Sequence, residues 1–592
     1  MDKNTVWAIV LSILVIVVSG FFFTPKAVKQ EASAQQTVEA QKSENTTNKV
    51  EDLSAVLGTE QVAEIEEVKQ EEKITIKTNK AEIVITNKGA DIISYTLDPE
   101  THKDYETGKG VQLSDNITDV NRTCAISLGT AENNIINGIF DIKKIDDYTY
   151  LFTKDVIVNN RKVTFGKKYT FTPDEYMFRL DVLIHDESGS GLDSNGVAYT
   201  IRTSPQIGPH FNRKQNKYEN RQFIAFNGKK AKKPILTDGA FKHWDKDIMW
   251  GGIASKYFIE LIVPADSTII KNAAYSTKIE IDDYANAQAM IERKAFVGKD
   301  VQDTYFMYFG PRNEKDLQIY NVSDNNYWRL SGYKLSESLQ SSGWLSWLET
   351  ILKWCLEILH IPFKNWGVCI ILLTLILKII LFPLSKKQSL GTLKMQELQP
   401  KIQAIQKKYA NDQQKQQAEM AKIYQEAHYN PASGCLPLIF QFLILFAMYN
   451  LFNNYFEFRG ASFIKGWIPD LSTGDSVYAL KKDIPVISTF LGVSHIRILP
   501  VIYVATQLLS GKITQNSGMG GQNAASMKFM TYGMPLLFFF IFYNAPSGLL
   551  LYWLTSNILQ IVQQIIINKI MKEKRSEMAN KKAVPAKSGK KK

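Results

Sequence analysis

The sequence predicts a multi-span α-helical membrane protein with six spans, a large periplasmic antiparallel β-sandwich and a cytoplasmic helical hairpin. Three observations support this fold class. Long apolar runs alternate with polar loops across residues 364–570, and the loop 385–433 is basic whereas 453–496 is neutral, which is typical of membrane helices. Residues 73–335 instead alternate apolar and polar side chains with a period of two, which indicates strands. A further apolar run of span length occupies residues 6–23.

The N-terminal region predicts a membrane anchor followed by a tether. Residues 1–23 contain the first apolar run behind Lys3, and no good small-x-small cleavage site follows it directly. An uncleaved anchor (span 1) is therefore favoured over a cleaved signal peptide. Residues 24–72 are rich in Gln, Glu, Ala, Lys, Ser and Thr and have almost no aromatic side chains. This composition cannot bury a core, so we expect a flexible linker.

Residues 73–335 are expected to form the β-sandwich domain. Apolar and polar residues alternate over residues 163–171, a Thr172-Pro173-Asp174 turn follows, and the alternation then resumes. Two such runs joined by a turn are typical of antiparallel strands. Sandwiches of this kind often bind sugars, and Trp244 or Trp250 could line a cleft, although core packing is the preferred interpretation for most of these aromatic residues.

An amphipathic helix and a second span follow the sandwich. Residues 344–360 place Trp344, Trp347 and several aliphatic residues on one helical face. Such a face suits a membrane interface, and packing against the sandwich is the alternative. The second span, 364–384, carries Lys378 in an otherwise apolar helix. A Lys near the centre of a span costs about 2.5–3.5 kcal/mol, which makes it a candidate functional residue.

Later apolar runs predict four more spans, at residues 434–453, 485–511, 527–544 and 547–570. The apolar centre of the fourth span, residues 498–511, is only fourteen residues long. That length gives about 21 Å of helix, which is short of a hydrocarbon core of about 30 Å. Either residues 484–493 extend this helix or the bilayer is thinned locally. A very tight turn at residues 544–548 joins the last two spans.

The distribution of charge predicts the orientation in the membrane. The loop 385–433 has eight Lys against four acids, and residues 569–592 have ten Lys or Arg against two acids. The positive-inside rule therefore places this loop, the basic tail 571–592 and both termini in the cytoplasm. Apolar stripes in the loop, interrupted at Asn411-Asp412, predict a helical hairpin that is better suited to docking partners than to catalysis. Basic segments of this kind also allow contact with anionic lipid or RNA.

Polar side chains inside the predicted spans are the candidate site. Thr374 lies four residues before Lys378 and therefore on the same helical face. Further amides occur in later spans, namely Gln441, Asn557, Gln560, Gln563 and Gln564. Such amides can simply join helices by hydrogen bonds. Lys378 has no acidic residue in any apolar run to pair with it, so we infer a water-filled cavity open toward the cytoplasm.

Motifs for other chemistry are missing from the sequence. The four cysteines have no metal-ligand spacing, and Cys124 alone lies in the predicted sandwich. Residues 518–521 are rich in glycine but lack the Lys-Ser/Thr of a phosphate loop. No nucleophile elbow or His-Glu-x-x-His helix occurs. We therefore expect a non-enzymatic protein that needs no cofactor and no metal.

A specific set of motifs runs in order through residues 344–570. Its members are Asn365-Trp366-Gly367, Thr374, Lys378, Pro383-Leu384, residues 398–402, Asn430-Pro431, residues 434–437 with Gln441, residues 546–549, Tyr552 and Ser556-Asn557. This set resembles that of the YidC family of bacterial membrane protein insertases. The sandwich is similar in kind to the periplasmic domain of the Gram-negative members, a likeness of architecture and not of motifs.

The resemblance implies insertion and folding of proteins in the bacterial inner membrane, without ATP, alone or beside the Sec translocon. It implies that the positive residue at Lys378 lines a hydrophilic groove, open to cytoplasm and lipid, that receives the polar part of a nascent membrane protein. The other residues expected in this groove are Thr374, Gln441, Tyr552, Trp553 and Asn557. The hairpin and the basic tail are implicated in recruiting the ribosome and the targeting receptor.

Two residues depart from the family pattern. The family usually has Arg where this chain has Lys378, and Trp553 replaces a second aromatic residue that carries a hydroxyl. Lys keeps a compact positive charge but lacks the planar five-donor fork of Arg. Attraction of a negative group therefore survives the change, whereas a bidentate grip on a carboxylate does not.

Two other functional classes remain as alternatives. A solute transporter would usually have repeated halves and a continuous polar path, and no internal repeat occurs in the sequence. A membrane-anchored carbohydrate enzyme would depend on the sandwich and would tolerate changes in the last five spans. We expect the reverse dependence.

Overall fold

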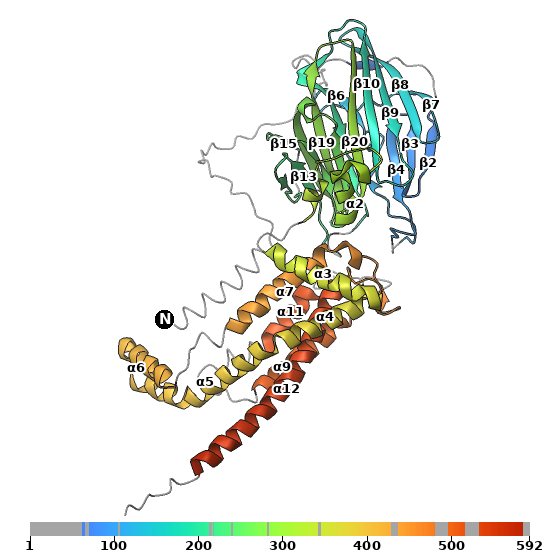
Figure 1. Ribbon diagram of the computed structural model, residues 1–592. Coiled ribbons are helices and arrows are strands. Elements are labelled where there is room, and N and C mark those ends of the chain that lie inside the picture. The colour runs from blue at the N-terminus through green and yellow to red at the C-terminus, as the bar shows by residue number, and fades with distance from the viewer. Residues whose placement is uncertain are drawn as a thin grey trace, which may run out of the picture.

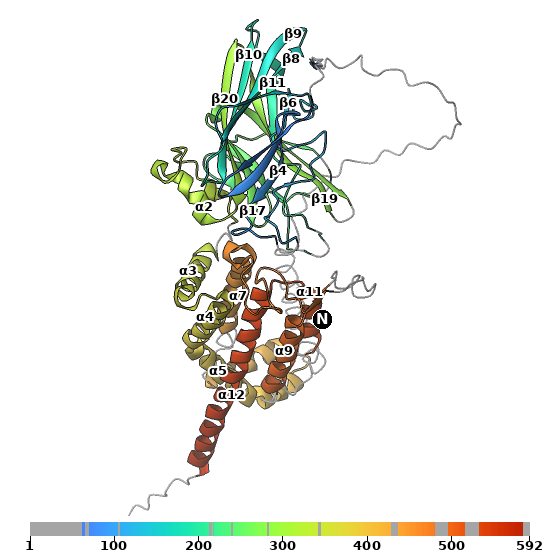
Figure 2. The same cartoon turned by 90° about the vertical axis from the view of Figure 1, so that its right-hand side faces the viewer.

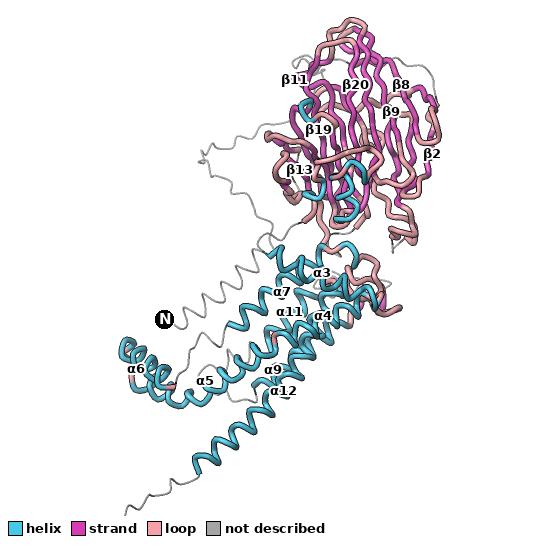
Figure 3. Tube along the Cα trace, in the orientation of Figure 1, coloured by secondary structure: helices cyan, strands magenta, loops and turns pink. Residues whose placement is uncertain are grey.

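A computed structural model describes most of the chain as a β domain followed by a helical domain (Figure 1). The described residues are 62–64, 70–104, 107–211, 213, 216, 218–237, 239, 241–280, 283–340, 345–427, 436–479, 495–515 and 532–583. The predicted anchor 1–23 therefore lies outside the described residues. In Figure 3 the long cyan helices lie apart from the large magenta sheets, and only short helices occur among those strands.

Two antiparallel sheets dominate the β domain. The larger sheet contains β1 (Val62–Glu64), β7 (Asp141–Lys144), β8 (Thr149–Val158), β9 (Arg161–Thr170), β10 (Met177–Asp186), β13 (Gln222–Phe226), β14 (Ala231–Lys232), β16 (Trp250–Ala254), β17 (Phe258–Pro264) and β20 (Asp300–Pro311). The second sheet contains β6 (Ile126–Leu128), β11 (Leu192–Arg202), β15 (Lys242–Trp244), β18 (Ile270–Glu280) and β19 (Asp283–Phe296). Smaller sheets contain β2 (Lys73–Lys77), β3 (Ala81–Thr86) and β4 (Asp91–Leu97), and β5 (Ser114–Asp115) with β12 (Gln206–Ile207).

The strands predicted on either side of the Thr172-Pro173-Asp174 turn are β9 and β10. They pair antiparallel, with Thr170 opposite Arg179. The period-two pattern succeeds here because alternate side chains of a strand face opposite sides, so one set enters the core. An antiparallel β-sandwich domain is therefore confirmed.

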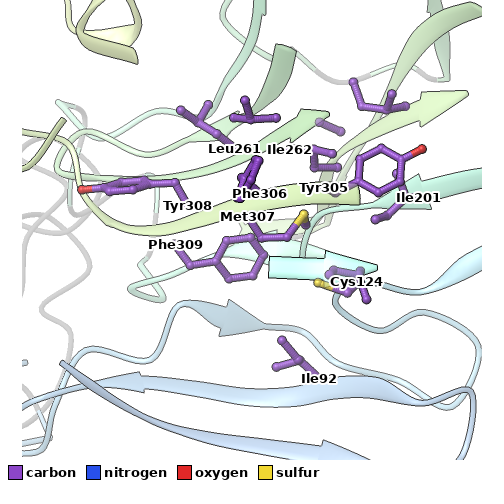
Figure 4. Close-up of a cluster of buried hydrophobic side chains, with 14 of the residues drawn as sticks. Ile92, Cys124, Ile201, Leu261, Ile262, Tyr305, Phe306, Met307, Tyr308 and Phe309 are labelled. Carbon is purple, nitrogen blue, oxygen red and sulfur yellow. The ribbon is translucent and has the colours of Figure 1, made fainter. Parts of the chain in front are cut away.

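Aromatic and aliphatic side chains fill the sandwich core. Figure 4 shows Ile92, Cys124 and Met307 among the buried side chains of this cluster. Trp250 is fully buried, stacks on Phe226 at 4.8 Å between ring centroids, and donates a 2.8 Å hydrogen bond to the Tyr333 carbonyl. Core packing is thus the correct interpretation of this tryptophan.

The expectation of a wholly flexible linker over residues 24–72 is wrong at β1. Val62–Glu64 pairs antiparallel with β8, with Val62 opposite Val158. The physical reason is that an edge strand presents unpaired N–H and C=O groups, which a passing segment can satisfy. Composition excludes a hydrophobic core in this region but does not exclude the addition of one short strand.

The helical domain contains eight longer helices within its described residues. These are α3 (Ser346–Phe363), α4 (Trp366–Ile380), α5 (Phe382–Lys408), α6 (Gln413–Glu426), α7 (Leu436–Asn454), α9 (Leu499–Gln515), α11 (Met534–Phe542) and α12 (Ser547–Ala583). Figure 2 shows α12 between α4 and α9, and both helices contact it. Helix α12 also continues past residue 570 into the basic segment, which is helical to Ala583.

One described helix, Ser547–Ile570 within α12, is long and apolar enough to cross a membrane. Two shorter apolar helices, Trp366–Ile380 and Leu499–Ile513, accompany it. A continuous fourth span over residues 485–511 does not form, because β22 (His495–Ile496) is extended and pairs with β21 (Tyr478–Ala479). Strand backbone at these residues prevents α9 from beginning before Leu499.

The two domains contact each other through a short segment after α7. Arg459 lies with its guanidinium carbon 5.0 Å from the centre of the Phe258 ring and donates a 3.2 Å hydrogen bond to the Lys103 carbonyl. The Phe456 ring lies edge-on to the buried His102 at 5.6 Å. Burial lowers the pKa of His102 to about 4, so this aromatic contact is uncharged at neutral pH.

Candidate functional site

The start of α4 explains the Asn365-Trp366-Gly367 motif. The Asn365 side chain accepts a 3.1 Å hydrogen bond from the Val368 N–H and so caps the helix. Trp366 stacks on His360 of α3 with 3.9 Å between ring centroids. A side chain at Gly367 would place its Cβ 2.2 Å from the Phe463 ring, so glycine allows this close packing. The motif therefore fixes where α4 begins.

Lys378 lies in the last turn of α4, and its side chain contacts α12, the helix beside α4 in Figure 2. Its Nζ donates a 2.9 Å hydrogen bond to Oε1 of Gln560. The Nε2 of Gln563 donates a 3.0 Å hydrogen bond to the Lys378 carbonyl. Two glutamines three residues apart, which share a helical face, thus hold both the charge and the backbone of this residue.

Lys378 has a neutral hydrogen-bond partner, although the sequence offers no acidic one in the apolar runs. The ammonium is not unpaired, because the Gln560 amide oxygen accepts from it at 2.9 Å. That acceptor is neutral, so the hydrogen bond leaves the positive charge uncompensated. An ammonium has three donors, and this contact uses one of them.

Thr374 does not contribute its hydroxyl to this contact. It is 1% exposed, and its Oγ1 donates a 2.6 Å hydrogen bond to the Ile370 carbonyl in its own helix. Hydroxyl side chains in helix interiors commonly bond to the preceding turn in this way. The spacing between Thr374 and Lys378 therefore places them on one side of α4 without joining their polar atoms.

One face of α12 carries Trp553, Asn557 and Gln560 at spacings of four and three residues. The Trp553 ring lies 5.7 Å from that of Tyr503 and 4.6 Å from that of Phe542. Among the described residues, Trp553 Nε1 and Asn557 Nδ2 are buried donors without a hydrogen-bond partner. Asn557 lies about one helical turn, and Trp553 about two turns, from Gln560, the acceptor of Lys378.

Two predicted site residues lie elsewhere or cannot be placed. Tyr552 is buried, with its ring 6.2 Å from that of Phe452 on α7, and belongs to the helix-packing core. Gln441 lies in α7, but its side chain is outside the described part of the structure.

The start of α12 explains the Pro546–Leu549 motif. Ser547 Oγ donates a 2.7 Å hydrogen bond to the Asp470 carbonyl, and the Gly548 N–H donates to the Leu471 carbonyl at 2.9 Å. The first turn of α12 is therefore bonded to the segment that precedes α9. Within the described residues, no cluster of three or more His, Cys, Asp or Glu that could hold a metal occurs.

Gln560 was noted in the sequence as an amide but was not predicted as a site residue. The useful signal was its spacing from Asn557 and Trp553, which lie on the same face of α12. Its pairing with Lys378, 182 residues away in the chain, had no local signal. The structure thus brings together Lys378 and Gln560, with Asn557 and Trp553 aligned beyond them.

Comparisons with known proteins agree along the whole chain. Sequence models described as "YidC periplasmic domain" and "60Kd inner membrane protein" match residues 73–355 and 358–575. The membrane protein insertase YidC of Treponema denticola is 43% identical over 592 residues, covering 97% of this chain and 100% of the relative. That of Treponema pallidum is 35% identical over 624 residues, covering 96% and 99%.

A crystal structure of an active YidC insertase with its first transmembrane domain resolved is 17% identical to this chain. It covers 85% of this chain and 94% of its own, with a TM-score of 0.35. The family assignment rests on the sequence matches, which span both the β domain and the helical domain. The chain belongs to the YidC family of membrane protein insertases.

Proposed function

We propose that this protein inserts and helps to fold proteins of the bacterial inner membrane through a hydrophilic groove centred on Lys378. The groove is open to the cytoplasm and to lipid, and the protein works alone or beside the Sec translocon. The observation that carries the proposal is the Lys378–Gln560 hydrogen bond, in which a positive charge has a neutral partner. A client carboxylate or carbonyl can take the place of that amide without breaking an ion pair.

The unpaired donors on α12 support this chemistry. Trp553 Nε1 and Asn557 Nδ2 are buried without partners among the described residues. A buried donor left unsatisfied costs about 1–3 kcal/mol, so water or the carbonyls of a client segment stabilise it. Together with Lys378 they present donors only, which suits a peptide segment whose own carbonyls would otherwise enter lipid unsatisfied.

Short membrane helices lower the free-energy cost of moving a polar segment across the bilayer. The apolar segments of α4 and α9 are Trp366–Ile380 and Leu499–Ile513. At 1.5 Å per residue each segment is about 22 Å long, below a hydrocarbon thickness of about 30 Å. Local thinning of the bilayer at these helices shortens the path that a polar segment must cross.

The orientation follows from charge and from the position of Lys378. Six spans place both termini in the cytoplasm and the sandwich in the periplasm. Helices α5 and α6, which pack together, begin at the Lys378 end of α4 and form the cytoplasmic hairpin.

The hairpin and the basic tail recruit the ribosome and the targeting receptor and contact anionic lipid. Asn557 and Trp553, on the same face of α12 as Gln560, complete the wall of the groove.

The proposal is tested by complementation in cells depleted of their own insertase. Lys378→Arg is expected to support growth and client insertion, and Lys378→Glu is expected to fail, because the sign of the charge is reversed. Lys387→Glu, at an exposed lysine in α5, is the matched control for a charge reversal outside the groove. Insertion by Lys378→Glu at the wild-type level would exclude the charge mechanism. Full activity of Lys378→Ala would mean that hydration suffices without a charge.

A further inference from the structure

A cavity of about 1190 Å³ lies between the sandwich and the outer end of the helical domain. Its sandwich wall includes Thr118 and His210, and its opposite wall includes Thr473 and Arg497. Figure 2 shows the two domains one beside the other, and the contacts of Arg459 with Phe258 and Lys103 join them. Pockets that hold small molecules occupy about 300–1,000 Å³, so this space is large enough for a segment of polypeptide.

The floor of the cavity is formed where two groove helices begin. Arg497 lies two residues before α9, and Pro546 immediately precedes α12. Gln560, the partner of Lys378, is thirteen residues beyond the first residue of α12. That separation corresponds to about 20 Å of helix, or about six residues of extended chain. A polar segment that passes Lys378 along α12 therefore reaches this floor.

Charges in the walls are already paired in part. His210 contacts Asp115 Oδ2 at 2.7 Å and Asp283 Oδ2 at 3.1 Å. Arg459 lies over the Phe258 ring. His210 and Arg459 therefore already have partners, and the rest of the lining contains both acidic and basic side chains, so the walls do not present one sign of charge to a single small ion.

Two residues of the cavity wall each contain a buried polar atom that has no hydrogen-bond partner among the described residues. Arg497 is 8% exposed and its Nε has no hydrogen-bond partner among the described residues, and Ser472, 5% exposed, has an unpartnered Oγ. One atom is a donor, and the hydroxyl both donates and accepts. A peptide backbone offers the complementary pair of N–H and C=O groups along its whole length.

We propose that this cavity, the interdomain cavity, receives the polar segment of a client protein after that segment has crossed the membrane. The inference rests on the proposed groove, because it needs a client that passes Lys378. The cavity keeps the emerging segment hydrated and hydrogen-bonded on the outer side while its apolar helix leaves into lipid. The occupant is the client polypeptide itself, recognised by its backbone groups.

Site-specific photo-crosslinking in membrane vesicles tests this with the full-length protein. The probe is a ribosome-stalled, single-span client whose polar N-terminal tail is varied in length. A photoreactive residue replaces Thr473 or Thr118 in the cavity, Gln560 in the groove, or Val297, which is 85% exposed in the turn at the other end of β20. We expect groove crosslinks at every tail length and cavity crosslinks only when the tail extends at least about six residues past Gln560.

The possible outcomes separate this inference from the proposed function. Groove crosslinks with cavity crosslinks no stronger than those of Val297 would overturn the cavity proposal and leave the groove intact. An inserted client that crosslinks at neither Gln560 nor the cavity would overturn both. As a second measurement, Thr473→Trp partly fills the cavity from an exposed position and should slow the insertion of long-tailed clients several-fold without slowing short-tailed ones. If Thr473→Trp slowed long-tailed and short-tailed clients equally, or slowed neither, the proposal would be contradicted.

Discussion

Nζ of Lys378 in α4 donates a 2.9 Å hydrogen bond to Oε1 of Gln560 in α12, 182 residues further along the chain. Gln563 on the same helix donates to the Lys378 carbonyl, so the residue is held at two atoms. A carboxylate in place of Gln560 would have bound the ammonium more strongly and cancelled its charge. The neutral amide positions the charge without cancelling it, which is what the proposed groove requires.

Gln560→Glu should therefore abolish most client insertion, to a level near that of Lys378→Glu. The new carboxylate would lie within hydrogen-bond distance of Lys378 and form a partly buried ion pair that a client must break. Protease protection of an inserted client in membrane vesicles measures the effect. Gln564→Glu is the matched control, because Gln564 donates to Asn568 and not to Lys378. Wild-type insertion by Gln560→Glu would show that the charge need not be free.

Local patterns predicted the features that depend on local physics. The strands β9 and β10 were predictable because their side chains alternate about a turn. Lys378 was predicted as a candidate site residue because a charge within an apolar helix is costly wherever the helix packs, and that role stays a prediction. These inferences need only the residues near one another in the sequence.

Tertiary contacts account for what the sequence could not predict. The pairing of Lys378 with Gln560 depends on how α4 packs against α12, which no spacing within either helix specifies. Thr374 was placed on the correct helix, yet its hydroxyl bonds to the Ile370 carbonyl instead of joining the site. The start of α9 depends on a two-residue strand pairing between His495 and Ala479. In each case the hydrogen-bond partner that a residue adopts depends on which groups the folded chain brings next to it.

Glu260 should make the stability of the sandwich depend on pH. It is fully buried, and burial raises its pKa to about 8 from an ordinary value of 4.5. The folded state therefore holds a proton that the unfolded chain releases, and stability falls as pH rises from 4.5 to about 8. Each pH unit in this window costs at most about 1.4 kcal/mol. Below pH 4.5 the effect disappears.

Glu260→Gln isolates that contribution. Glu260 accepts from the Ser204 N–H at 2.8 Å and from the Ser204 hydroxyl at 2.6 Å. A glutamine can accept from the N–H and donate to the hydroxyl oxygen, because the hydroxyl hydrogen is free to rotate. The thermal midpoint of the purified protein should match that of the wild type near pH 5 and exceed it at pH 8. A wild-type midpoint that falls equally steeply in the variant would assign the pH dependence to other groups.

Asp91 should be the most costly charge to remove from the sandwich. Its carboxylate accepts from Lys167 Nζ and, at 2.9 Å, from Arg122 Nε, and all three side chains are at most 3% exposed. Asp91→Asn would leave two buried cations without their counter-charge, which costs about 3–5 kcal/mol. Chemical denaturation, followed by tryptophan fluorescence, measures the loss in free energy of unfolding.

The exposed pair Lys77–Glu82 provides the control for Asp91. Its atoms are 2.9 Å apart, but the side chains are 75% and 51% exposed. Exposed ion pairs contribute about 0.2–1 kcal/mol, so Glu82→Gln should have a small effect. Equal losses from Asp91→Asn and Glu82→Gln would mean that burial does not decide the strength of these pairs.

Asp475 should determine whether α9 begins at the correct residue. Its Oδ2 accepts from the N–H groups of Ile498 and Leu499 at 2.8 and 3.0 Å, and from Trp467 Nε1 at 3.0 Å. These N–H groups lie at the start of α9 and have no partner within the helix. Asp475→Ala removes all three bonds at a fully buried site and should cost about 2 kcal/mol or more.

Hydrogen exchange gives a local readout for the Asp475 variant. The amides of Ile498 and Leu499 should exchange faster in Asp475→Ala, because the acceptor that protects them is gone. Asp266→Ala is the control: Asp266 caps a single 3-10 turn in the sandwich through one 2.9 Å hydrogen bond to the Thr268 N–H, far from α9 in sequence. Asp475→Asn keeps one acceptor oxygen and should fall between the wild type and the alanine variant. Unchanged exchange at both α9 amides in Asp475→Ala would show that the helix start is held by its packing against α12 and not by this carboxylate.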